Sequence, residues 1–110
     1  MKALQTYDHP TVLVAGDGDE LDRLLVNCLR RNGFHVLEGD WEVVFDVVRV
    51  HSRPIHLLVA DVSLEAHVPI LKSHRSELQV LLIKKPFDVG DVLAKIRQLL
   101  DSPPSPSSIR

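Results

Sequence analysis

Short runs of apolar residues alternate along the chain with longer segments whose apolar residues recur at helical spacing. A run that is apolar at nearly every position is typical of a strand buried on both faces, because a half-exposed strand would alternate apolar and polar residues. The strands predicted in this way are Val12–Ala15, Phe34–Leu37, Ile55–Val62 and Gln79–Ile83.

The segment after the first strand predicts an amphipathic helix. Its apolar residues fall at i, i+3, i+4, i+7 and i+8, namely Leu21, Leu24, Leu25, Cys28 and Leu29. Asp17 or Asp19 is suited to cap its start, and Gly33 is suited to end it. Cys28 lies in the apolar register, which predicts a small buried side chain and not a reactive thiol.

Three further helices follow the later strands. The second carries Trp41, Val44, Phe45 and Val48 on one face and ends at Ser52–Pro54. A weaker helix is predicted over Val68–His74, where Pro69 suits a first turn. The last begins after the capping residue Asp88 and has apolar residues at helical spacing up to Leu100.

Four alternations of strand and helix predict an α/β fold, a doubly wound parallel sheet of about four strands with helices on both faces and right-handed crossovers. Ligands and chemistry collect at the carboxyl ends of the strands in such sheets. The polar residues at those ends are Asp17, Asp61 and the pair Lys84–Lys85. Two acids and a lysine are therefore expected to converge.

Length and composition bound the class of protein. The 110 residues, 45% of them hydrophobic, indicate one domain, which we place at residues 11–101 between a lead-in (1–10) and a disordered Ser/Pro-rich tail (102–110). A net charge of -2 argues against nucleic acid as a partner. A single cysteine and the absence of a signal peptide or a long apolar stretch predict a cytoplasmic protein without a membrane span.

The converging residues suggest phosphoryl chemistry. Two facing carboxylates remain ionised together only when a cation neutralises them, and Mg²⁺ suits carboxylate ligands while leaving positions open to a phosphoryl oxygen. Asp61 is then placed as a carboxylate nucleophile and Lys85 as a partner for the charge on the transferred group.

At this point the chain resembles the receiver (CheY-like) domains of two-component response regulators. The resemblance rests on "TVLVAGDGDELDRLL", "RRNGFHVLEGD", "PIHLLVADV" and "KKPFDVGDVLAKIRQLL", in collinear order from Thr11 to Leu100. It implies a flavodoxin-like fold, Asp61 as the phosphoacceptor, and a Mg²⁺ site made by Asp17, Asp61 and the backbone carbonyl of Ser63. It also implies that Lys85 pairs with the phosphoryl group and that the bond before Pro86 is cis.

The chain departs from that family in two respects. Gly16 stands where family members carry the first acid of a pair, which predicts weaker metal binding. Asp61 and Lys85 are only 24 positions apart (85 - 61), so one strand–helix unit of the family, with its switch residues, has no counterpart here. The strand Gln79–Ile83 then becomes an apolar sheet edge, for which we expect a second copy or a partner.

Other motifs fail on particular residues. A nucleotide-binding G-x-G-x-x-G loop needs a glycine where Leu21 stands, and an EF-hand loop needs one where Asp22 stands. The six histidines show no paired zinc spacing. A triad drawn from Asp61, Ser63 and His67 lacks a nucleophile elbow.

Two functions follow from the resemblance. The first is a stand-alone receiver domain in a phosphorelay, since only residues 101–110 follow the last helix; it is a phosphoacceptor and not an enzyme, and its partner is a sensor histidine kinase or a phosphotransfer protein. The alternative is a pseudo-receiver that docks a partner or dimerises without phosphorylation. A small enzyme using the strand-end acids ranks last, because no substrate-pocket motif accompanies them.

Overall fold

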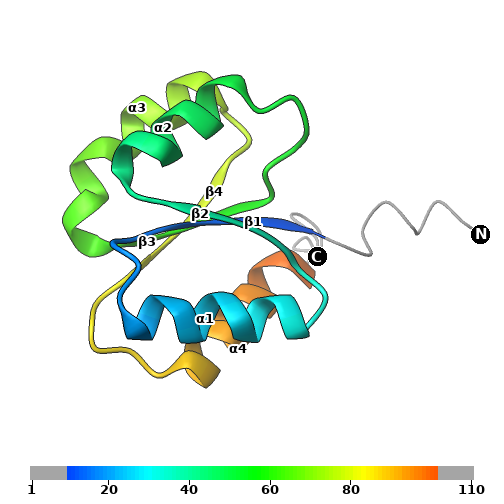
Figure 1. Ribbon diagram of the computed structural model, residues 1–110. Helices are drawn as coiled ribbons and strands as arrows, with labels where there is room; N and C mark the ends of the chain where they lie inside the picture. Colours follow the sequence, from blue (N-terminus) through cyan, green and yellow to red (C-terminus); the bar gives the residue numbers. More distant parts are fainter. Residues whose placement is uncertain (1–9, 102–110) are drawn as a thin grey trace, which may run out of the picture.

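Strands and helices alternate throughout the described part of the chain, residues 10–101 of a computed structural model (Figure 1). The order is β1 (Thr11–Ala15), α1 (Glu20–Arg31), β2 (His35–Gly39), α2 (Trp41–Val50), β3 (Leu57–Asp61), the 3₁₀ helix η2 (Val62–His67), α3 (Val68–His74), β4 (Gln79–Ile83) and α4 (Val89–Asp101). The expected tail, residues 102–110, and residues 1–9 of the lead-in lie outside this part.

The four strands form one parallel sheet in the order β2-β1-β3-β4. Figure 1 shows α2 and α3 on one face of the sheet and α1 and α4 on the other. This arrangement confirms the predicted α/β fold, a doubly wound parallel sheet of four strands. Because the strands run the same way, the ends of β1, β3 and β4 meet at one edge, where the acids and the lysine were expected.

The hydrophobic core lies in two layers, one on each face of the sheet. Alternate residues of β1 enter different layers, so that Val12 and Val14 pack toward α1 and α4, while Leu13 and Ala15 pack toward α2 and α3. Leu57–Ala60 of β3 divide in the same way. Both central strands are therefore buried on both faces, at about 1.5–3 kcal/mol for each fully buried large aliphatic side chain.

The face that α1 buries differs from the predicted one. Leu24 is 55% exposed, Cys28 is only half-buried, and the buried positions are Asp22, Leu25, Val26 and Leu29. Both faces contain Leu25 and Leu29, so periodicity alone allows either one. The contact with β1 and α4 turns the helix toward Val26 and brings an acid, Asp22, to the inner side.

Several strand boundaries also differ from prediction: β1 begins at Thr11 and not at Val12, and β3 begins at Leu57 and not at Ile55. β2 begins at His35 and continues to Gly39, since it pairs with β1 as far as Ala15. β3 stops at Asp61 and not at Val62, because the Asp61 carboxylate accepts a hydrogen bond of 2.8 Å from the Ser63 N–H and turns the chain into η2. No pattern in the sequence predicted that 3₁₀ helix.

Candidate functional site

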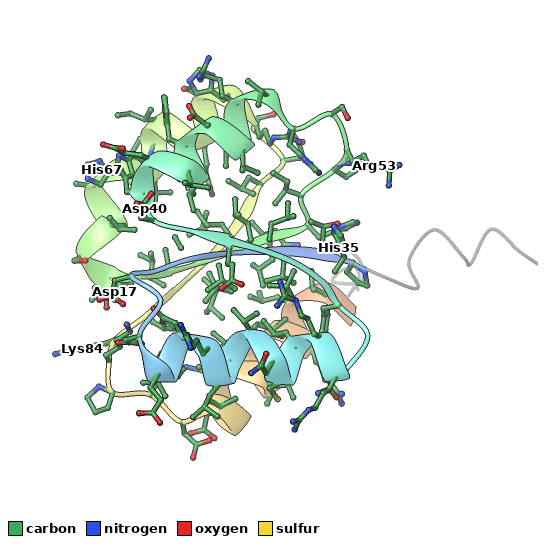
Figure 2. The ribbon with its side chains drawn as sticks, viewed as in Figure 1. Asp17, His35, Asp40, Arg53, His67 and Lys84 are labelled. Atoms are coloured by element: carbon green, nitrogen blue, oxygen red, sulfur yellow. The ribbon has the colours of Figure 1, made fainter. Side chains whose placement is uncertain are left out.

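The candidate site is a pocket of about 420 Å³ at the carboxyl ends of β1, β3 and β4. The side chains and strand ends that line it include those of Asp17, Asp22, Asp40, Trp41, Asp61, Ser63, Leu64 and Lys85. In Figure 2, Asp17 lies where β1 ends, with Asp40 and His67 toward the α2 side of the sheet. His35 and Arg53 lie at the opposite edge. The predicted residues Asp17, Asp61, Ser63 and Lys85 thus share one pocket.

The turn between β1 and α1 carries the first acids of the site. The Asp19 carboxylate caps α1 by accepting a hydrogen bond of 2.9 Å from the Asp22 N–H, so Asp19 and not Asp17 is the cap. The Asp17 carboxylate is 76% exposed and accepts from the Asp19 N–H at 3.3 Å. That hydrogen bond, with the nearby Lys85 ammonium, holds the pKa of Asp17 below its ordinary value.

Lys85 follows β4 and reaches across the pocket to this turn. Its Nζ lies 2.7 Å from Asp19, 3.2 Å from Asp22 and 3.4 Å from Asp17. These acids raise the pKa of Lys85, the hydrogen bond with Asp19 most of all, and the same hydrogen bond lowers the pKa of Asp19. Lys85 therefore carries a firm positive charge. The Lys85–Pro86 peptide bond is cis, and the neighbouring Lys84 is exposed.

Asp22 is the functional candidate that sequence reasoning missed. Its side chain is only 8% exposed, and its Oδ2 accepts a hydrogen bond of 3.2 Å from the Gly18 N–H. A signal was present, because Asp22 precedes Leu25, Val26 and Leu29 by three, four and seven positions. An acid in the register of a buried helix face needs a partner, and Lys85 is that partner here.

Asp61 ends β3, beside β1 in the sheet. Its carboxylate is accessible, and hydrogen bonds from the hydroxyl and the N–H of Ser63 hold its pKa below the ordinary value; the Lys85 charge contributes less. Among the described residues no direct bond joins Asp61 to Lys85. The ion pairs of Lys85 go to the acids of the β1–α1 turn and the start of α1, namely Asp17, Asp19 and Asp22. Asp61 is thus an ionised, open carboxylate.

The donor set fits a hard divalent cation. Ligand oxygens of Asp17, Asp19 and Asp22 lie within 4.8 Å of one another, and Asp61 borders the same pocket. Carboxylate oxygens are the ligands that Mg²⁺ and Ca²⁺ prefer. The Lys85 ammonium already occupies a cation's place among these acids. Asp17, Asp19 and Asp22 therefore form an acidic cluster that could hold a cation, and the metal site predicted from Asp17, Asp61 and the Ser63 carbonyl stays a prediction.

On the α2 side the pocket is lined by Trp41, which forms an aromatic wall with His67 and Phe45. The indole of Trp41 stacks on the imidazole of His67 with ring centroids 4.4 Å apart, and it also lies 5.8 Å from the ring of Phe45. His67 ends the 3₁₀ helix that begins directly after Asp61. The wall therefore joins α2 to the segment that follows the candidate phosphoacceptor.

Comparisons with known proteins agree with this architecture. No protein-family model matches the sequence, and no curated protein is significantly similar to it. Two crystal structures share its fold, that of the receiver domain from the hybrid histidine kinase CckA and that of a response regulator from Thermotoga maritima. Their TM-scores are 0.61 and 0.67, each at 21% identity. The matches cover 82% and 86% of this chain, and 98% and 99% of the other two.

The fold and the site together show the class of protein: an α/β domain with an acidic pocket at the carboxyl ends of a parallel sheet. Within that class the chain has the receiver-domain fold, as the resemblance implied. None of the helices in residues 10–101 is long and apolar enough to cross a membrane.

Proposed function

We propose that this chain is a response-regulator receiver domain in which Asp61 accepts a phosphoryl group. The observation that carries the proposal is the shared pocket, in which an accessible carboxylate at the end of β3 faces the acids of the first turn and Lys85. The receiver-domain fold supports it.

In the proposed reaction, a carboxylate oxygen of Asp61 attacks the phosphorus of a phosphohistidine. The new O–P bond forms as the P–N bond breaks, and the imidazole leaves with that bond's electron pair and takes up a proton from water. Lys85 supplies positive charge toward the phosphoryl oxygens. A divalent cation held by the acids would offset their remaining charge. The chain is then a phosphoacceptor and not an enzyme.

The donor in this proposal is a sensor histidine kinase or a phosphotransfer protein, and the compartment is the cytoplasm. One cysteine, Cys28, cannot form an internal disulfide, which supports a reducing compartment.

A labelling experiment tests the proposal. The full chain is incubated with Mg²⁺ and either acetyl phosphate or a phosphorylated histidine kinase, and protein-bound, hydroxylamine-sensitive phosphate is measured. We expect labelling of the wild type and of Asp46→Asn, which removes an exposed acid of α2, and none of Asp61→Asn. A wild type without label, or an Asp61→Asn variant that labels equally, would remove the proposal.

One observation favours a second function, that of a pseudo-receiver. The Lys85 ammonium contacts Asp17, Asp19 and Asp22, so the ammonium itself can serve as the cation of this acidic cluster in place of a metal ion. A domain of this kind would act by docking or dimerising. The pseudo-receiver is favoured if the wild type takes up no label and binds no Mg²⁺ at millimolar concentration in calorimetry.

A further inference from the structure

The Asp22 carboxylate occupies the space at the end of β1 that a side chain on residue 16 would need. A Cβ atom placed on Gly16 would lie 2.3 Å from Oδ2 and 2.8 Å from Cγ of Asp22, which is closer than real contacts of a Cβ atom. The backbone does not call for glycine at this position, because the positive φ angles in residues 10–101 are those of Gly18 and Gly33. The Asp22 carboxylate therefore stands where a side chain of residue 16 would be.

The Asp22 carboxylate is held in that place. It comes from the first turn of α1, on the inner face of the helix, and only 8% of the side chain is exposed. The Gly18 N–H and the Lys85 ammonium each contact its Oδ2 at 3.2 Å. A buried carboxylate is stable when such partners replace water. Asp22 is thus pre-organised along the wall of the pocket.

The charges around Lys85 do not balance. Three carboxylates, those of Asp17, Asp19 and Asp22, contact one ammonium, which leaves two negative charges (3 - 1) in the cluster. With Lys85 in place, one divalent cation has the charge that would neutralise them.

We propose that Asp22 supplies the second carboxylate of the divalent-cation site, in the place that Gly16 leaves open. The acid has moved from the strand end to the first turn of the following helix, and the glycine is what admits it. Gly16 then marks a relocated ligand and not a weakened site. The inference rests on the proposed function for the identity of the cation, Mg²⁺.

Two binding measurements on the full chain test the inference without any activity assay. Calorimetry measures the affinity for Mg²⁺, and electron paramagnetic resonance measures the affinity for Mn²⁺. We expect Asp22→Asn to weaken both affinities about 10-fold or more. The matched control is Asp40→Asn, which removes one acid from the same pocket outside the Asp22 cluster. Asp40 caps α2 by accepting a hydrogen bond of 3.1 Å from the Val43 N–H, and asparagine keeps an acceptor for that cap. Asp40→Asn should change the affinities less than about 3-fold. Equal affinities of the wild type and a folded Asp22→Asn would overturn the inference.

If Asp22→Asn does not fold, the inference can still be tested by placing the acid at residue 16. The double variants Gly16→Asp/Asp22→Ala and Gly16→Asn/Asp22→Ala have almost the same shape and differ in one charge at the volume in question. We expect the first to bind the cation within about 3-fold of the wild type and the second to bind about 10-fold more weakly. Equal binding by the two double variants would overturn the inference.

The outcomes separate this inference from the proposed function. If Asp61 is labelled but the cation affinity does not change with substitutions at residues 16 and 22, the inference about Asp22 is overturned and the proposed function is not. Cation binding that depends on Asp22, in a chain whose Asp61 takes up no label, would remove phosphoryl transfer and support the ligand.

Discussion

Two aspartates of the pocket are held in opposite ways. Asp22 is buried on α1 and bonded to Gly18 and Lys85, whereas Asp61 is accessible and bonded only to its neighbour Ser63 among the described residues. A buried, fixed carboxylate suits a ligand or a structural charge. An open, ionised one suits the nucleophile that the proposed function requires.

The acids around Lys85 make stability depend on pH. The pKa values of Asp17 and Asp19 are lower in the folded chain than in the unfolded one, so the folded state binds these protons less readily. Their contribution to the free energy of unfolding is full above about pH 4 and is lost as the pH falls through the folded-state values. We expect the urea midpoint of the wild type to fall between pH 6 and pH 3.

Asp19→Asn isolates one of these groups, because asparagine keeps an acceptor for the α1 cap and removes the charge. We expect its urea midpoint to fall less between pH 6 and pH 3 than that of the wild type. Parallel curves for the two proteins would contradict the assignment of this pH dependence to the Lys85 cluster.

At the scale of elements, Arg75 joins α3 to the end of α2. Its guanidinium donates to the carbonyl oxygens of Val48 at 2.6 Å and Arg53 at 3.1 Å, and also to that of His51. The last carbonyl groups of a helix lack hydrogen-bond donors within the helix, and a cation near them also interacts favourably with the negative end of the helix dipole. Arg75 therefore anchors the α2–β3 connection from another element.

We expect Arg75→Ala to lower the free energy of unfolding by about 2–4 kcal/mol, because several charge-assisted hydrogen bonds are lost together. Arg75→Lys should lose part of that amount, since an ammonium keeps the charge without the planar fork. Urea denaturation measures both. Arg49→Ala, which removes an exposed pair with Asp46, is the control and should cost less than about 1 kcal/mol; an equal loss would contradict the anchor.

The aromatic wall gives a second prediction at this scale. Trp41, the single tryptophan, and Leu64 of η2 line the same pocket as Asp61. A group added to Asp61 would enter the pocket that the indole also lines, and the indole stacks on His67. We expect Mg²⁺ with acetyl phosphate to change Trp41 fluorescence in the wild type and in His67→Ala. An unchanged spectrum in a labelled wild type, or an equal change in Asp61→Asn, would contradict this link.

For the whole molecule, the sheet order leaves β4 at one edge. Its residues from Val80 to Ile83 are half-buried, and its outer side has no neighbouring strand in the described chain. An edge of this kind offers unpaired N–H and C=O groups to another chain. The expected homodimer through Gln79–Ile83 stays a prediction.

Sedimentation of the full chain from about 10 μM to about 1 mM, with amide exchange at the same concentrations, tests this edge. We expect the dimer fraction to rise with concentration and exchange in β4 to slow with it. Exchange in β2, the opposite edge, serves as the control and should not change. A monomer at every concentration would contradict the prediction.

Much of the site was predictable because strand ends are local features. The runs that end before Asp17, near Asp61 and before Lys84 are written in consecutive residues, and parallel strands bring such ends together. Their convergence on one pocket is confirmed, while Asp61 as the phosphoacceptor stays a prediction. The 3₁₀ helix η2 was missed, since the Asp61 carboxylate caps its start through the Ser63 N–H and its residues follow no hydrophobic period.

The sequence by itself determined the order of strands and helices, the parallel α/β class and the residues at the carboxyl edge, because hydrophobic spacing and turn residues act over a few positions. Only the tertiary structure decided which face α1 buries and which acids Lys85 meets. The acids that Lys85 meets lie more than 60 positions away, as Asp22 does, and the inner face of α1 packs against α4 as well as β1. That packing placed the Asp22 carboxylate in the volume that Gly16 leaves open.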